Sequence, residues 1–116
     1  MSTYTLVCSV AELPAPGRAR RFEVAGVPVA VVATEGELFA LADTCSHDEV
    51  SLADGEVDGH TIECWLHGSR FDVRTGKALC LPARKSVHVY DIKVDDDGVY
   101  LNTGSRSFHR QESKPR

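Results

Sequence analysis

Residues 45–72 read CSHDEVSLADGEVDGHTIECWLHGSRFD, and this stretch constrains the fold of the whole chain. It contains two short groups, Cys45-Ser46-His47 and Cys64-Trp65-Leu66-His67, with sixteen residues between them. Each group offers one thiol and one imidazole. Chance is a poor explanation for such matched offsets, so the four side chains are candidate ligands of one metal centre.

Three other uses of these side chains compete. Residues 1–10 lack a basic segment followed by a long apolar run, so we expect an unexported, cytoplasmic protein, in which disulfides are disfavoured. A reactive thiol needs no matched histidines. Structural zinc is the main rival, but its usual finger pairs Cys with Cys and His with His, whereas the pairs here are mixed.

Mixed Cys-x-His and Cys-x-x-His loops suit a cluster in which one iron takes two thiolates and the other takes two imidazoles. At this point the chain resembles the Rieske ferredoxin family. The resemblance runs through both loops, through Gly68-Ser69-Arg70-Phe71-Asp72, and through Thr75-Gly76-Lys77 followed by Pro82. It implies one [2Fe-2S] cluster per chain, with the inner iron on Cys45 and Cys64 and the outer iron, near the surface, on His47 and His67.

The rest of the sequence predicts an all-β fold. Short apolar stretches cover residues 4–10, 19–24, 27–33, 37–41, 61–64, 70–73, 87–94 and 99–102. Turn signals separate them, among them Ala25-Gly26, Glu35-Gly36 and Asp58-Gly59, and no segment reads as a long amphipathic helix. This spacing predicts a small antiparallel sandwich or barrel. The resemblance adds a cluster-binding subdomain of two loops, covered by a third that contains Pro82.

The length of 116 residues suits one domain, which we place at 1–104. Residues 105–116 carry four basic side chains against one acid, and we expect a mobile basic tail there. The formal charge of -4 therefore leaves the first 104 residues at -7, which argues against nucleic acid as a partner. No window approaches the roughly 20 apolar residues of a membrane span. We expect a monomer.

Residues 43–59 are polar and longer than an ordinary connection, so they predict a loop. Seven acids and no Lys or Arg lie between positions 43 and 63: Asp43, Asp48, Glu49, Asp54, Glu56, Asp58 and Glu63. The run is either a solvated loop or a surface that steers a partner with a basic docking site.

The reduction potential can also be predicted from the resemblance. High-potential Rieske proteins carry an extra cysteine in each loop, where this chain has Val50 and Leu66. They also direct a serine and a tyrosine toward the sulfurs. Ser69 matches the serine, although it serves equally well as a turn cap, while Phe71 lacks the hydroxyl. We predict a potential near the low end of the Rieske range, roughly -150 mV.

Several neighbours of the ligands have simpler interpretations. We expect Trp65, Leu66 and Phe71 to pack around the inner iron and exclude water. Cys8 and Cys80 lack ligand spacing and are interpreted as buried free thiols, with Cys80 close to Pro82 and the cluster. His88 is interpreted as an ordinary strand residue.

The resemblance implies a single-electron carrier that serves a flavin-dependent reductase and the terminal oxygenase of an aromatic-ring dioxygenase, as in the biphenyl and carbazole systems. The chain itself reads as non-catalytic, because only His60, His88 and His109 remain for the mononuclear iron of an oxygenase. Two alternatives are an electron donor or redox sensor elsewhere, such as in iron-sulfur metabolism, and a structural zinc module.

Overall fold

The computed structural model describes residues 4–44, 50–65, 68–80, 85–96 and 98–102. Within these ranges the chain forms strands and two single-turn 3₁₀-helices: β1 (Thr5–Cys8), η1 (Val10–Glu12), β2 (Arg18–Val24), β3 (Val27–Thr34), β4 (Glu37–Ala42), η2 (Leu52–Asp54), β5 (Glu56–Asp58), β6 (Thr61–Glu63), β7 (Arg70–Asp72), β8 (Val89–Asp95) and β9 (Gly98–Asn102). The prediction of an all-β fold is confirmed. In the described part of the chain no helix has the length and hydropathy needed to cross a membrane. The tail predicted at 105–116, and its boundary, lie outside the described residues.

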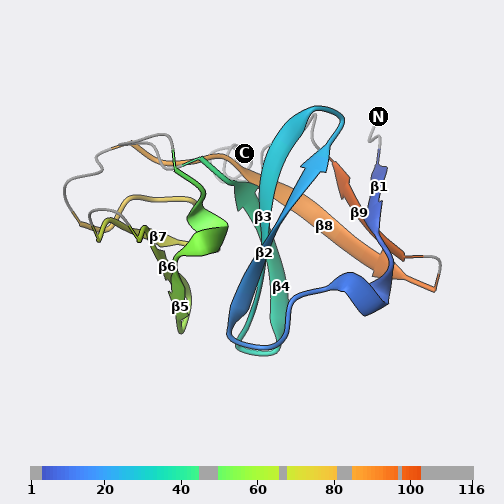
Figure 1. The fold of residues 1–116 in the computed structure, drawn as a ribbon, viewed down its shortest axis with the longest axis horizontal. Coiled ribbons are helices and arrows are strands. Elements are labelled where there is room, and N and C mark those ends of the chain that lie inside the picture. The colour runs from blue at the N-terminus through green and yellow to red at the C-terminus, as the bar shows by residue number, and fades with distance from the viewer. Residues whose placement is uncertain (1–3, 45–49, 66–67, 81–84, 97, 103–116) are drawn as a thin grey trace, which may run out of the picture.

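The described strands form two antiparallel sheets (Figure 1). The larger has the order β1-β9-β8-β4-β3-β2, and the smaller has the order β5-β6-β7. Two tight turns build the meander β2-β3-β4. Ala25-Gly26 has φ of 53° and 82° and Glu35-Gly36 has φ of 53° and 75°, which are the two left-handed positions of a type I′ hairpin turn. Both turns were predicted from the sequence.

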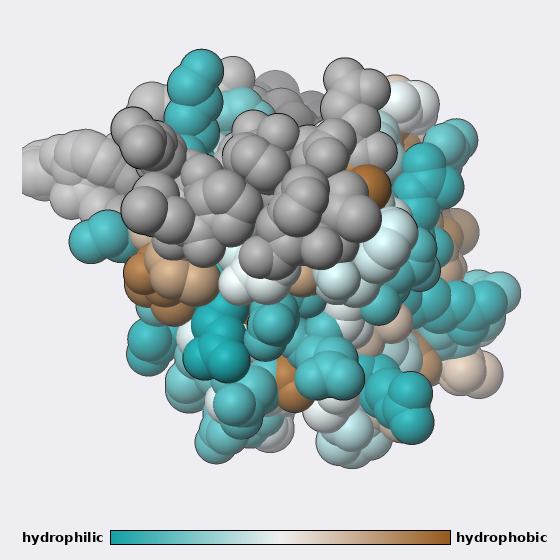
Figure 2. Space-filling view, turned by 60° about the vertical axis from the view of Figure 1, so that its left-hand side comes forward, coloured by the Kyte–Doolittle hydropathy of each residue, from teal (hydrophilic) through white to brown (hydrophobic). Residues whose placement is uncertain are grey.

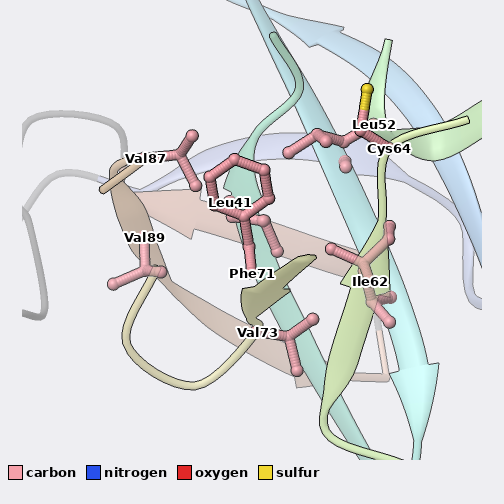
Figure 3. Close-up of a cluster of buried hydrophobic side chains, with 10 residues drawn as sticks. Leu41, Leu52, Ile62, Cys64, Phe71, Val73, Val87 and Val89 are labelled. Atoms are coloured by element: carbon pink, nitrogen blue, oxygen red, sulfur yellow. The ribbon is translucent and has the colours of Figure 1, made fainter. Parts of the chain in front are cut away.

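The core forms on both faces of β3, which explains why this strand reads as a nearly continuous apolar run. One cluster fills the space between the two sheets (Figure 3): Ala30, Val32, Leu41, Leu52, Ile62, Cys64, Phe71, Val73, Val87 and Val89. The second lies on the opposite face: Val24, Val29, Val31, Ala40 and Leu101. Full burial of a side chain such as Phe71 contributes about 1.5–3 kcal/mol, so the first cluster is a major source of stability for the small sheet.

The prediction of a continuous loop over 43–59 was wrong at its end, where β5 forms. Only Val57 of its three residues is apolar, so the sequence gives almost no strand signal. The strand forms because it pairs with β6 in a short hairpin, with Val57 opposite Ile62. His88 lies one residue before β8, and its carbonyl accepts a hydrogen bond from the Ala42 N–H (2.8 Å).

Gly55 joins η2 to β5 at a point where two backbones meet. Its N–H donates to the Leu52 carbonyl (2.9 Å), and a Cβ added there would overlap the backbone carbonyl of Glu63. We therefore predict that Gly55→Ala lowers the free energy of unfolding by at least about 2 kcal/mol, the range of core overpacking. Chemical denaturation measures this.

The control is Gly36→Ala, where φ is +75° but no atom lies within 4 Å of the added Cβ. Gly36→Ala should lower the free energy of unfolding by only about 1 kcal/mol, the cost of backbone strain at a left-handed position. A Gly55→Ala loss no larger than the control loss would contradict the steric argument.

Candidate metal centre

Cys64 opens the second ligand loop directly after β6. Its side chain is 1% exposed, and its thiol is free. The Cys64 N–H donates to the Ser69 carbonyl (2.7 Å), and the Gly68 N–H donates to the Cys64 carbonyl (3.0 Å). In Figure 3 the sulfur points away from Ile62 and Val73, at the margin of the apolar cluster. The backbone thus closes the loop and holds one thiol at the edge of the core.

The first ligand loop is closed in the same way. The Leu52 N–H donates to the Asp43 carbonyl (2.6 Å), and Thr44 and Ser51 form an antiparallel bridge. Leu52 and Cys64 belong to the same buried cluster. The exit of the first loop and the entry of the second are therefore held by one patch of core.

The described residues include one of the four predicted ligands, Cys64. Cys45, His47 and His67 lie outside the described residues, as do Leu66 and Pro82. Within the described ranges no three His, Cys, Asp or Glu side chains gather as a metal site.

Two observations bear on whether the loops fit a cluster. Cys64 offers a buried thiol that has no disulfide partner in the described part of the chain, and such a thiol is a suitable soft ligand for iron. At the base of the first loop, the Ser51 hydroxyl is buried and has no hydrogen-bond partner among the described residues. A buried hydroxyl of this kind is costly, and it suits a place where a bound group brings an acceptor. The residues around both loops fit such a group.

The two remaining cysteines differ from each other. Cys8 is buried, as predicted, and burial raises the pKa of its thiol, with a further increase from the Glu12 carboxylate. Cys80 is exposed, so its assignment as a buried thiol was wrong. Its Sγ lies 3.6 Å from the Gly68 carbonyl oxygen, and the N–H of the preceding Leu79 donates to the Arg70 carbonyl (2.7 Å). The predicted proximity of Cys80 to Pro82 and the cluster involves groups outside the described residues.

The expected packing role holds for Phe71, which is 0% exposed, and was wrong for Trp65, which is 55% exposed. In this segment Cys64 takes the inward position after β6, and the next side chain consequently meets solvent. Ser69 is 1% exposed and buried beside the same loop. Composition alone does not reveal which side of a turn an aromatic residue takes.

The acidic run is not one surface. Asp43 is 2% exposed, and its Oδ2 lies 3.2 Å from Nε of Arg21. Glu63 is also paired, with its Oε1 3.3 Å from Nε of Arg70. The exposed acids that remain are Asp54, Glu56 and Asp58 on η2 and β5, with Asp48 and Glu49 outside the described residues. Hydrophilic side chains predominate on the described part of the face that brings the small sheet forward (Figure 2). The basic partners Arg21 and Arg70 lie outside the run, so a local count missed them.

Another carboxylate shapes the turn after β7. Asp72 receives hydrogen bonds from the Arg74 backbone N–H (2.8 Å), from Nε (3.0 Å) and from Nη2 (2.9 Å). These contacts with Arg74 hold the pKa of Asp72 below its ordinary value. This turn leads into Gly76, whose carbonyl accepts a hydrogen bond from the Val87 N–H (2.8 Å).

An all-β scaffold that presents two closed loops, each with a cysteine and a histidine in its sequence, defines a protein built to hold a metal centre at its loops. A family model described as Rieske [2Fe-2S] domain matches residues 3–91. The chain belongs to the Rieske [2Fe-2S] domain family, and its cofactor is accordingly one [2Fe-2S] cluster.

Several curated relatives of the chain are ferredoxin components of dioxygenases. The chain is 41% identical over 98 residues to the ferredoxin component of biphenyl 2,3-dioxygenase from Rhodococcus jostii, covering 84% of this chain and 91% of that protein. It is 44% identical over 96 residues to the 3-phenylpropionate/cinnamic acid dioxygenase ferredoxin subunit of Photorhabdus laumondii, covering 82% and 90%. The solved ferredoxin of carbazole 1,9a-dioxygenase from Nocardioides aromaticivorans superimposes with a TM-score of 0.79 at 37% identity, covering 86% and 97%. The predicted resemblance and the predicted fold are confirmed.

Phe71 gives a test of the low predicted potential. It shares the buried cluster with Cys64 and lacks the hydroxyl of the high-potential proteins. Phe71→Tyr should raise the midpoint potential by about 40 mV, because one hydrogen bond of about 1 kcal/mol to the reduced state corresponds to that shift in a one-electron couple. Redox titration of the variant and the parent measures it.

Phe22→Tyr is the matched control, since Phe22 packs against the other apolar cluster. Its potential should equal that of the parent. Equal shifts in both variants, or no shift in Phe71→Tyr, would refute the assignment.

Proposed function

We propose that this chain carries single electrons from a flavin-dependent reductase to the terminal oxygenase of an aromatic-ring dioxygenase system. The observation that carries the proposal is the pair of closed loops on one patch of core, in a Rieske chain that spans about nine-tenths of ferredoxin relatives. A solved complex of reduced oxygenase and oxidised ferredoxin from carbazole 1,9a-dioxygenase contains a chain with a TM-score of 0.79 and 33% identity, covering 91% of this chain and 97% of that one. It supports an oxygenase as the acceptor.

The proposed ligands are Cys45 and Cys64 for the inner iron and His47 and His67 for the outer iron. When bound, the cluster accepts and releases one electron at a time. The charges of two ferric ions, two sulfides and two thiolates sum to zero when both imidazoles are neutral. Such a cluster accepts an electron more readily than a cluster held by four thiolates, whose oxidised form has a charge of -2. The role of the chain is to hold the two thiolates in closed loops. The two imidazoles then face the redox partner.

A carrier needs no substrate site, and we propose that this chain is not itself an enzyme. The mononuclear iron of an oxygenase takes two histidines and a carboxylate. Beyond the proposed ligands the chain has His60, His88 and His109. The His60 ring packs edge-on against Phe39, with ring centroids 5.9 Å apart, so packing already accounts for it. The alternatives of a redox sensor or a zinc module gain no support from the relatives.

We also propose a cytoplasmic location and a monomeric carrier. Thiols such as the exposed Cys80 remain reduced in the cytosol, whereas oxidising compartments favour disulfides.

Replacing any of the four proposed ligands by Ala should abolish the cluster. The purified parent should be brown, with two irons and two sulfides per chain, and each variant should lose both the colour and the iron. The measurement is iron and sulfide analysis with visible absorption. The controls are Cys8→Ala, Cys80→Ala, His60→Ala and His88→Ala, which should stay loaded.

A colourless parent with one zinc per chain would refute the cluster ligands. Electron carriage itself is tested by reconstitution, in which the loaded chain should support product formation by a ring-hydroxylating oxygenase and its reductase. A loaded chain that accepts no electrons from any such reductase would contradict the proposed role.

The three exposed acids on η2 and β5 should steer the chain toward a basic partner. Replacing Asp54, Glu56 and Asp58 by their amides should slow electron transfer to the oxygenase about tenfold at low salt. The difference should vanish at high ionic strength, because salt screens exposed charges. Stopped-flow rates across a salt series measure it.

The control changes the same net charge elsewhere, at Glu23, Asp95 and Asp96, which are exposed on β2 and at the end of β8. It should leave the rate near that of the parent. If both sets of substitutions slow transfer equally, net charge and not a local surface is responsible.

A further inference from the structure

Asp43 lies immediately after β4 and is 2% exposed. Both of its backbone groups are engaged: its N–H donates to the Pro28 carbonyl (3.1 Å), and its carbonyl accepts from the Leu52 N–H (2.6 Å). Its side chain is engaged as well. Oδ1 accepts from the Ala53 N–H (2.9 Å), and Oδ2 pairs with Nε of Arg21 (3.2 Å). A single residue therefore contacts two strands of the large sheet and the segment that follows the first ligand loop.

These contacts clamp the first loop from both ends. Asp43 stands at the entry of the loop, and the amides of Leu52 and Ala53 stand at its exit in η2. Leu52 in turn packs in the cluster that contains Cys64. The hydrogen bonds of Asp43 thus connect the position of the first loop to the base of the second.

Arg21 gives the clamp its charge balance. It is 46% exposed on β2 and pairs with two carboxylates, the exposed Glu23 through Nη2 (3.1 Å) and the buried Asp43 through Nε. A buried carboxylate is costly without a partner, whereas an exposed pair contributes little. Of the two ion pairs of Arg21, the one with Asp43 therefore contributes more to stability.

We propose that Asp43, held by Arg21, is a positioning residue that fixes the first ligand loop around the cluster and sets part of the reduction potential. This inference rests on the proposed ligand Cys45. One residue, Thr44, separates Asp43 from Cys45, so their Cα atoms lie at most about 7 Å apart. At such a distance a buried charge is only weakly screened. Removing either member of the pair leaves an unbalanced charge beside a centre whose own charge changes on reduction.

Three single substitutions in the loaded protein test the inference. Asp43→Asn keeps an oxygen that can accept from Ala53 but loses the charge, so the potential should rise. Arg21→Met leaves the carboxylate unbalanced, so the potential should fall. Glu23→Gln removes the other partner of Arg21 and is the matched control, which should match the parent. Redox titration and the electron paramagnetic resonance spectrum of the reduced cluster are the measurements.

Cluster retention gives a second measurement. Asp43→Ala loses the acceptor for the Ala53 N–H as well as the charge, and iron release to a chelator should become about tenfold faster, the scale of one lost buried hydrogen bond. Release from Glu23→Gln should equal release from the parent. If Asp43→Ala does not fold, Asp43→Asn against Glu23→Gln decides the question.

The inference is overturned if Asp43→Asn and Arg21→Met lower only the melting temperature while the potential and the resonance spectrum stay at the values of the control. Shifts of the same sign in both variants would overturn the charge argument equally. A parent chain without two irons and sulfide refutes the ligand proposal, whereas a loaded parent with an indifferent Asp43→Asn refutes this inference alone.

Discussion

The structure depends on the packing of a small sheet against one face of a large one. Strands of three residues, such as β5, β6 and β7, do not persist alone in water. They persist here because Ile62 and Phe71 are fully buried in one cluster with Leu41 of the central meander. Both ligand loops begin or end at this contact, so the same apolar surface stabilises the small sheet and locates the site.

The sequence predicted the hairpins well because their information is local: Ala25-Gly26 and Glu35-Gly36 permit the left-handed turn that the meander requires. It predicted the family from the spacing of cysteines and histidines. It failed for β5, which owes its structure to a partner strand and not to its own residues. It also failed for Trp65 and Cys80, because hydropathy does not state which way a loop side chain points.

The acidic run shows why charge must be assigned in three dimensions. Counted along the chain, Asp43 and Glu63 belong to one set with Asp54 and Glu56. In the fold, Asp43 is a buried structural group and Glu63 is paired on the surface, and each lies beside an arginine from another strand. The sequence predicts an acidic region but not which of its members a partner would meet.

The pairing of β1 with β9 joins residues that are far apart in the sequence, and this affects the order in which the chain folds during synthesis. Thr5 pairs with Leu101, so this edge of the large sheet forms only after residue 101 has been synthesised. The meander β2-β3-β4, in contrast, uses neighbouring residues and short turns, which favours rapid folding. On a ribosome the meander would therefore emerge and fold first, and both cluster loops would follow it onto a preformed surface.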